Sequence, residues 1–130
     1  NPRQMLEWAL IENVQREDLG PLDRAKAFER LEVEFGLSLA EIAEKIGKSE
    51  AYISNSIRLL SLPDAVKDGL LSGAISEGHA RAIAGLKTPE KIMTAYKQIL
   101  KEKASVRRAE EIARFLKEGD DEPSLRKKKK

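Results

Sequence analysis

Residues 38–60 read SLAEIAEKIGKSEAYISNSIRLL and hold the pattern that decides the fold. Apolar residues recur every three or four positions on both sides of Gly47, which is the spacing of two short amphipathic helices. Ser38 and Glu41 form a capping-box pattern at the start of the first helix, and Ser49 is placed to cap the second. Glycine takes the left-handed conformation of a tight reversal without steric cost. The segment therefore predicts a helix-turn-helix.

The second predicted helix carries polar side chains opposite its apolar positions. Ile53, Ile57 and Leu60 are expected to pack on the first helix. A helix-turn-helix that binds DNA lays its second helix in the major groove, so DNA binding is the leading interpretation. Two helices joined by a glycine turn are also a generic packing unit of helical proteins, which leaves a protein-interaction module open. The side chains left to face outward are Lys48, Glu50, Tyr52, Asn55 and Arg58.

The sequence on either side of this segment predicts further helices and no strand. Apolar residues keep a spacing of three to four, and glycine and proline separate the runs. No run shows the alternation of a half-buried strand, and no internal repeat is evident. The fold class is therefore all-α, a multi-helix domain that contains the helix-turn-helix. The additional helices are expected at residues 5–16, 22–35, 64–71, 77–86, 89–101 and 105–117.

The charge of the chain is small and unevenly distributed. The formal net charge is +2, yet residues 126–130 contribute five positive charges, so the residues before them sum to −3. Residues 119–123 read GDDEP and predict a stop, and residues 119–130 are expected to form a flexible basic tail. Residues 38–60 are neutral overall. Affinity for nucleic acid therefore requires basic groups that cluster in space.

Two further groups of residues are candidates for contacts with a phosphate backbone. His79 and Arg81 follow Ser76, which is placed to cap a helix, and a helix start presents N–H donors to an anion. The alternative interpretation is a packed histidine and a solvated arginine. The second group surrounds the helix start expected at residue 105, where a solvated face is the alternative. It contains Lys101, Lys103, Arg107 and Arg108.

Enzymatic and metal-binding interpretations find little support. The chain has no cysteine and a single histidine, His79, so a thiolate site, a histidine-rich metal site or a Ser-His-Asp triad lacks its parts. The phosphate-loop pattern G-x-x-x-x-G-K-[ST] does not occur. No apolar run of about 18 residues is present, and the first residues lack the form of a signal peptide. We expect no intrinsic catalysis, no metal site, no membrane span and an intracellular protein.

Four short motifs carry a family resemblance. Residues 11–19 read IENVQREDL, residues 47–49 read GKS, residues 57–60 read IRLL and residues 78–81 read GHAR. In this order they closely resemble the ParB family of chromosome- and plasmid-partition proteins, over about residues 10–113. The resemblance implies a cytoplasmic, nucleoid-associated dimer that binds double-stranded DNA at a palindromic, centromere-like site of parS type. It also implies spreading onto neighbouring DNA and a partner ATPase in segregation.

The resemblance also assigns roles to particular residues. DNA contacts fall on Lys48, Ser49, Tyr52, Asn55 and Arg58, with His79 and Arg81 beside them. In the family the Glu-Asn-x-Gln-Arg segment helps bind CTP and Mg²⁺, and the matching positions are Glu12, Asn13 and Arg16. The family's Gly-Glu-Arg-Arg nucleotide motif does not occur in this sequence. We therefore expect no cofactor in this chain alone, and CTP with Mg²⁺ in the full-length protein.

The resemblance divides the chain into three parts. Residues 1–20 correspond to the C-terminal end of a nucleotide-binding clamp domain, residues 21–118 to the helix-turn-helix DNA-binding domain and residues 119–130 to the basic tail. The family's C-terminal dimerisation domain is not evident after Phe115. We therefore expect dimerisation, and the contact with the partner ATPase through an N-terminal region, to belong to a longer protein.

One position departs from the family pattern. Relatives often carry a basic residue where this chain has Glu50. An acidic side chain repels phosphate or accepts a hydrogen bond from cytosine, so the base preference is expected to differ. Three alternatives stay open: a nucleoid-occlusion relative that binds a different site, a helical protein-interaction module without a DNA role, and a CTP-dependent switch that needs further domains.

Overall fold

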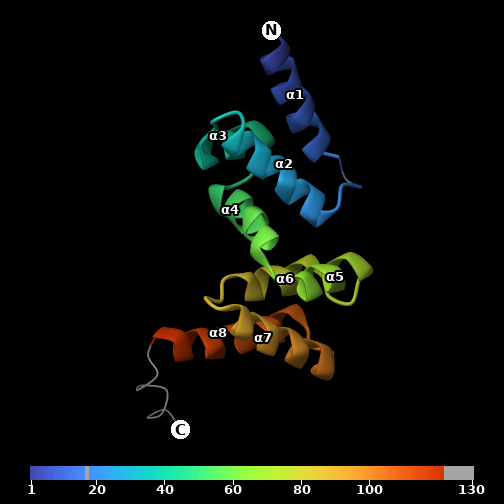
Figure 1. Cartoon of the computed structure of the whole chain (residues 1–130), viewed down its shortest axis with the longest axis vertical. Helices are drawn as coiled ribbons and strands as arrows, with labels where there is room; N and C mark the ends of the chain where they lie inside the picture. The colour runs from blue at the N-terminus through green and yellow to red at the C-terminus, as the bar shows by residue number, and fades with distance from the viewer. Residues whose placement is uncertain (17, 122–130) are drawn as a thin grey trace. The chain divides into compact units, whose positions relative to one another are not determined.

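The computed structural model describes residues 1–16 and 18–121, and every regular element among them is helical (Figure 1). The predicted all-α class is confirmed. Residues 122–130, which include most of the predicted basic tail, lie outside the described residues. The elements in chain order are α1 (Pro2–Val14), α2 (Pro21–Val33), α3 (Leu39–Ile46), α4 (Glu50–Arg58), the 3₁₀ turn η1 (Leu59–Ser61), α5 (Asp64–Ser72), α6 (Glu77–Ala84), α7 (Pro89–Glu102) and α8 (Val106–Asp121).

The chain folds as two compact units. The first unit, Asn1–Ser61, contains α1 to α4 and η1, and the second begins at Leu62 and contains α5 to α8. In the first unit α2 packs against α1, α3 and α4, so the helix-turn-helix is built on α2 (Figure 1). Apolar side chains from all four helices form its core, which consists of Val14, Ala27, Phe28, Leu31, Ile42, Ala43 and Ile53.

The helix-turn-helix forms as its sequence predicts. The Ser38 backbone N–H donates to Glu41 Oε1 at 2.8 Å, and the Glu41 N–H donates to Ser38 Oγ at 3.1 Å. The hydrogen bonds from Ser38 favour the ionised carboxylate and lower the pKa of Glu41. Gly47 has a φ of 83°, and Ser49 Oγ accepts the Tyr52 N–H at 3.0 Å. Local side chains and one glycine thus define both helix starts and the turn.

The first helix differs from its prediction at both ends. It begins at Pro2 because Asn1 and Gln4 form a capping box, in which the Gln4 N–H donates to Asn1 Oδ1 at 2.8 Å. It ends at Val14, two residues before the predicted end. Its apolar face is also less covered than the spacing predicts, because Val14 is buried whereas Leu6 is 50% exposed.

Other helix ends also differ from their predictions, among them that of α6, which ends at Ala84 rather than residue 86. α2 ends at Val33 rather than residue 35, before Gly36 with a φ of 70°. α4 ends at Arg58, and the chain continues as a 3₁₀ turn that buries Leu59. α8 runs through Gly119 to residue 121, so the predicted stop at residue 119 is wrong. One glycine in a helix costs only about 1 kcal/mol relative to alanine, which a continuing helix tolerates.

In the second unit α6 packs against α7 and α8. Two glycines let side chains of this unit approach a helix backbone closely. A Cβ atom at Gly78 in α6 would lie 3.0 Å from Val106 Cγ2, and one at Gly69 in α5 would lie 2.9 Å from Tyr96 Cζ. Buried side chains of α6, α7 and α8 make up most of this unit's core, among them Ala80, Ile83, Ile92, Ala95, Ile99, Ala109 and Ile112.

Candidate nucleic-acid interface

The outward face of α4 presents most of the side chains that the sequence predicts there. Asn55 is half-buried, and Arg58 Nη1 donates to Asn55 Oδ1 at 3.3 Å, so the guanidinium and the amide are oriented together. The opposite face of the helix is anchored because Ile53 is fully buried. The exposed polar side chains on and before this helix are Lys48, Ser49, Glu50 and Arg58.

Tyr52 does not face outward as predicted. Its side chain is half-buried, and its ring packs edge-on against Phe28 with centroids 6.2 Å apart and an interplanar angle of 71°. The Lys48 ammonium lies 5.2 Å from the centroid of the Tyr52 ring, in a cation–π contact. An aromatic ring has a large apolar surface, so the free energy gained by packing the ring against the core outweighs the gain from full hydration of its hydroxyl. The Tyr52 ring therefore packs at the edge of the core, and its hydroxyl is the polar end of the side chain.

His79 connects the start of α6 to the loop before α8. The Ser76 N–H donates to His79 Nδ1 at 3.0 Å, which leaves the proton on Nε2. Nε2 in turn donates to the Ala104 carbonyl at 2.7 Å. Both ring nitrogens are thus used inside the second unit, as the packed-histidine interpretation requires. A DNA contact from His79 stays a prediction.

Arg81 and Arg107 are two basic residues of the second unit that the sequence analysis assigns to DNA contacts. Arg81 is exposed, and its Nη1 lies 3.9 Å from Glu77 Oε2, a surface ion pair that contributes little to stability. Arg107 is exposed at the start of α8 and makes no ion pair with the described residues. The role of these two side chains in DNA binding stays a prediction.

Arg108 belongs to a network between α7 and α8. Its Nε donates to Glu102 Oε1 at 2.9 Å, and its Nη1 donates to Glu111 Oε1 at 3.3 Å. Gln98 donates to Glu102 as well, at 2.7 Å. These bonds, that from Arg108 foremost, lower the pKa of Glu102 to about 2, and the bond to Glu102 raises the pKa of Arg108. The predicted basic cluster is therefore divided, with Arg107 open and Arg108 engaged.

The three residues that the family resemblance assigns to nucleotide binding lie together at the end of α1. Glu12, Asn13 and Arg16 line a surface hollow of about 430 Å³ with Ala9. A carboxylate and an amide oxygen suit Mg²⁺, which commonly takes one protein carboxylate and completes its shell with phosphates and water. Arginine suits a phosphate group. The residue types thus fit a magnesium nucleotide, and this role stays a prediction.

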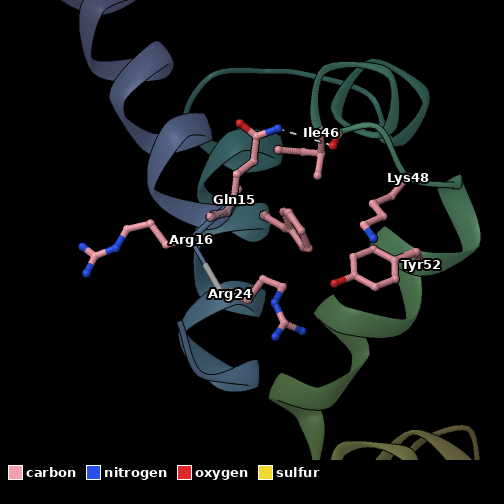
Figure 2. Close-up of a pocket in the computed structure, with 8 residues that line it drawn as sticks. Gln15, Arg16, Arg24, Ile46, Lys48 and Tyr52 are labelled. Carbon is pink, nitrogen blue, oxygen red and sulfur yellow. Dashed lines mark hydrogen bonds between the residues drawn. The ribbon is translucent and has the colours of Figure 1, made fainter. Parts of the chain in front are cut away.

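A second hollow, which the sequence does not predict, lies beside the helix-turn-helix (Figure 2). Its volume is about 340 Å³. Arg24, which the sequence analysis does not single out, lies one helical turn before Phe28, at the edge of the buried face of α2. The residues that line this hollow are Val14, Gln15, Arg16, Arg24, Phe28, Ile46, Lys48 and Tyr52.

Two kinds of site are absent from the described part of the chain. No cluster of three or more His, Cys, Asp or Glu side chains there is arranged to hold a metal ion. None of the helices at residues 1–16 and 18–121 is both long and apolar enough to cross a membrane. The polar surfaces described above are therefore the candidate sites.

Comparison with known proteins finds clear relatives. The family model described as the ParB HTH domain matches residues 17–118. The chromosome-partitioning protein Spo0J of Thermus thermophilus is 43% identical over 114 residues, which are 88% of this chain and 42% of that protein. The nucleoid occlusion protein of Geobacillus thermodenitrificans is 36% identical over 129 residues, 98% of this chain and 46% of that protein. The chain thus spans less than half the length of these relatives.

Solved structures of similar sequence share the helical fold. C-terminally truncated ParB from Caulobacter crescentus, complexed to the centromeric parS site, is 44% identical with a TM-score of 0.77, over 84% of this chain and 57% of that chain. A ParB DNA-binding domain, also complexed to parS, is 43% identical with a TM-score of 0.76, over 85% and 88%. The truncated Caulobacter crescentus protein complexed with CTP-γ-S is 44% identical with a TM-score of 0.56, over 73% and 51%.

Proposed function

The chain belongs to the ParB family, and we propose that it binds double-stranded DNA at a palindromic, centromere-like site of parS type in chromosome or plasmid segregation. The observation that carries the proposal is the arrangement of α4. Ile53 anchors one face of this helix in the core, while Glu50 and Arg58 stand exposed on the other. Two relatives of known structure, each 43% or 44% identical, are complexed to parS.

We infer that different side chains of this helix-turn-helix contact bases and phosphates. Arginine pairs with guanine, asparagine with adenine and an acidic side chain with cytosine, so Arg58, Asn55 and Glu50 are assigned to base edges. Lys48 and Ser49 lie at the start of α4, where a phosphate is favoured by the N–H groups and by the helix dipole.

Backbone contacts from the second unit complete the proposal. Residues 38–60 carry no net charge, so they cannot supply much of the salt-dependent affinity that DNA binding requires. Arg81 and Arg107 are exposed and suited to phosphates, whereas His79 and Arg108 act mainly by holding α6 and α8 in place. Removal of these positioning residues is therefore expected to weaken DNA binding indirectly.

We propose that the chain is the central part of a longer, dimeric protein of the cytoplasm and nucleoid. The curated relatives are more than twice its length, which leaves room for a dimerisation domain and for a region that contacts a partner ATPase. CTP with Mg²⁺ is the expected ligand of the full-length protein, and Glu12, Asn13 and Arg16 are the residues of this chain assigned to it. The relative complexed with CTP-γ-S supports this assignment.

A second candidate function is nucleoid occlusion through a different DNA site. The nucleoid occlusion protein of Geobacillus thermodenitrificans matches 98% of this chain, so the same fold occurs in proteins of both names. The two functions differ in the bases that are read, and Glu50 at the start of α4 is the position that we expect to decide between them.

The test is a titration of the chain with three labelled duplexes, followed by fluorescence anisotropy at several salt concentrations. One duplex carries a palindromic partition site, one a nucleoid-occlusion site and one a scrambled sequence of equal composition. For an intact dimer we expect the partition site to bind on the order of 4 kcal/mol more tightly than the scrambled duplex, with a smaller gap for a monomer. Affinity should also fall steeply with salt.

The three duplexes separate the outcomes. A preference for the nucleoid-occlusion site would support the second candidate function. Equal and negligible binding to all three would contradict DNA binding and favour a protein-interaction module. Equal but strong binding would show that the contacts are with the backbone only.

A further inference from the structure

Asn55 and Arg58 form a hydrogen-bonded pair on the outward face of α4. Ile53 is fully buried, and the residues two and five positions after it lie on the far side of a helix with about 3.6 residues per turn. Arg58 Nη1 donates to Asn55 Oδ1 at 3.3 Å, across one helical turn. Ala51, one turn before Asn55, is exposed and adds only a methyl group to this face. Both polar groups of the pair therefore lie on the side of α4 that faces away from the core.

The bond within the pair fixes the orientation of the Asn55 amide. A guanidinium has five N–H donors and no acceptor, so the amide atom that meets it is the oxygen and not the nitrogen. The Asn55 Nδ2 group, with its two N–H donors, is then the part of the amide directed away from Arg58. The bond to Asn55 uses one of the five donors of Arg58. The pair as a whole therefore offers hydrogen-bond donors and carries one positive charge.

This arrangement narrows the base that the pair can recognise. Asparagine alone pairs with adenine, because its oxygen accepts from the N6 amino group while its nitrogen donates to N7. Here the Asn55 oxygen already accepts from a cation, and adenine would bring the N–H groups of N6 beside that cation. Thymine presents one acceptor next to a methyl group, and cytosine presents a donor. Guanine presents two acceptors, N7 and O6, and is the base that a pair of donors fits best.

We propose that Asn55 and Arg58 read one guanine together, with donors from both side chains directed at its N7 and O6 atoms. The proposal rests on the proposed function and deepens it, because a joint contact with guanine replaces an independent contact between Asn55 and adenine. Asn55 thereby becomes a residue that determines specificity for guanine. The bond between the two side chains exists before DNA binds, which lowers the entropy lost when they are ordered on the base.

The first test is a double-mutant cycle measured by anisotropy on the partition-site, nucleoid-occlusion and scrambled duplexes. On the site that the wild type prefers, we expect Asn55→Ala to weaken binding about fivefold and Arg58→Ala about tenfold. The double variant should weaken it about fifteenfold rather than about fiftyfold, because each single change already disrupts the joint contact. Arg58→Ala combined with Arg114→Ala is the control cycle, since Arg114 is exposed on α8, and its losses should multiply. Losses that multiply for Asn55 and Arg58 as well would overturn the joint contact.

A second step identifies the base. Each G·C pair of the preferred site is exchanged for A·T in turn, and each A·T pair for G·C, and all duplexes are titrated with the wild type and both single variants. At one guanine of each half-site the wild type should prefer G·C by about tenfold. Both single variants should lower that preference to less than about threefold at the same position. A position where only Asn55→Ala reduces a preference for A·T would mean that Asn55 reads adenine, and the proposal would be wrong.

A base analogue separates direct contact from DNA shape. In 7-deazaguanine a C–H group replaces N7, while O6 and the pairing with cytosine are kept. At the identified position this analogue should weaken wild-type binding about threefold, because one hydrogen bond is lost. A wild type that binds the analogue as tightly as guanine would assign the preference to the shape of the duplex and contradict the contact.

A third variant distinguishes a base contact from a merely supporting role of Asn55. Asn55→Asp keeps an oxygen that accepts from Arg58 but has no N–H group to donate. If Asn55 served only to hold Arg58 in place, this variant would bind the preferred site as the wild type does, and the proposal would be wrong. We expect instead that Asn55→Asp weakens binding at least as much as Asn55→Ala and no longer distinguishes guanine from 7-deazaguanine.

Folding and the proposed function are controlled separately. Alanine favours a helix more than asparagine does, so Asn55→Ala should unfold at or above the wild-type temperature, and thermal unfolding checks each variant. If the wild type binds all three duplexes alike, the proposed function fails and this proposal falls with it. If the wild type prefers one site but Asn55→Ala and Arg58→Ala change the preference at no common guanine, the proposed function stands and the proposal alone is wrong.

Discussion

At the scale of single residues, the polar side chains of α4 divide into those held by the fold and those that we propose to read bases. Tyr52 packs on Phe28, whereas Arg58 is exposed and its guanidinium donates to Asn55. Helical periodicity places both residues on the outward side. It predicts which side of the helix a side chain points from, and it does not predict how deeply that side chain is buried. The burial of the Tyr52 side chain depends on Phe28, which lies 24 positions earlier in the chain. It could therefore not be predicted from residues 38–60 alone.

We predict that Arg58→Ala weakens the specific DNA complex by about 1–3 kcal/mol, the usual loss for one base-reading side chain. Binding to a scrambled duplex should change much less, because base contacts contribute little there. Anisotropy on both duplexes measures the difference. Arg114→Ala is the matched control, since Arg114 is exposed on α8 and carries the same charge. An equal loss on both duplexes would instead make Arg58 a phosphate contact.

At the scale of helices, capping patterns predict where most elements begin. Ser38, Ser49, Ser76 and Thr88 each cap the helix that the sequence assigns to them, because capping joins residues only three apart. The hydrogen bonds between elements that are distant in the sequence could not be predicted in this way. The bond from His79 to Ala104 spans 25 residues and depends on the close approach that Gly78 permits at Val106.

The network between α7 and α8 predicts a pH dependence of stability. The folded-state pKa of Glu102 is about 2, below its ordinary value of 4.5, so the ionised carboxylate stabilises the fold above that ordinary value. This contribution is lost as pH falls from about 4.5 through about 2, where Glu102 becomes protonated in the folded state as well. Both partners are on the surface, so the effect should be modest and reduced by salt.

The measurement is thermal unfolding of the wild type and Glu102→Gln between pH 7 and pH 2. The wild type should unfold at the higher temperature at pH 7, and the two curves should converge toward pH 2. Glu110→Gln, on the exposed surface of α8, controls for the loss of one negative charge. If Glu102→Gln and Glu110→Gln behave alike at every pH, the network does not stabilise the second unit.

At the scale of the whole molecule, the proposed affinity for DNA must come from several separated cations, because the bulk charge is too small. The residues before 126 sum to −3, and the structure leaves only some of the basic side chains open. Charge counting could not separate Arg107 from Arg108, since the engagement of Arg108 depends on Glu102 and Glu111 in folded helices. The phosphate contacts that we propose are Lys48, Arg81 and Arg107.

Three phosphate contacts per chain set the expected salt dependence. Each neutralised phosphate contributes about −0.9 to the slope of log affinity against log salt, so the slope should be about −3 per bound chain. The five positive charges at residues 126–130 would add to this slope if they also lay on the backbone. Anisotropy is measured from about 50 to 200 mM salt, with the full chain and with a chain that ends at residue 125. The shorter chain gives the slope due to the folded part, and the difference between the two chains gives the slope due to residues 126–130.

Loss of residues 126–130 should weaken binding to the partition-site and scrambled duplexes by the same factor, because backbone charge carries no sequence information. The ratio of the two affinities should therefore remain unchanged, while Arg58→Ala lowers it. A ratio that falls when these residues are removed would assign specificity to the basic end and contradict the role proposed for α4. A ratio of one in both chains would reduce the whole interaction to non-specific electrostatics.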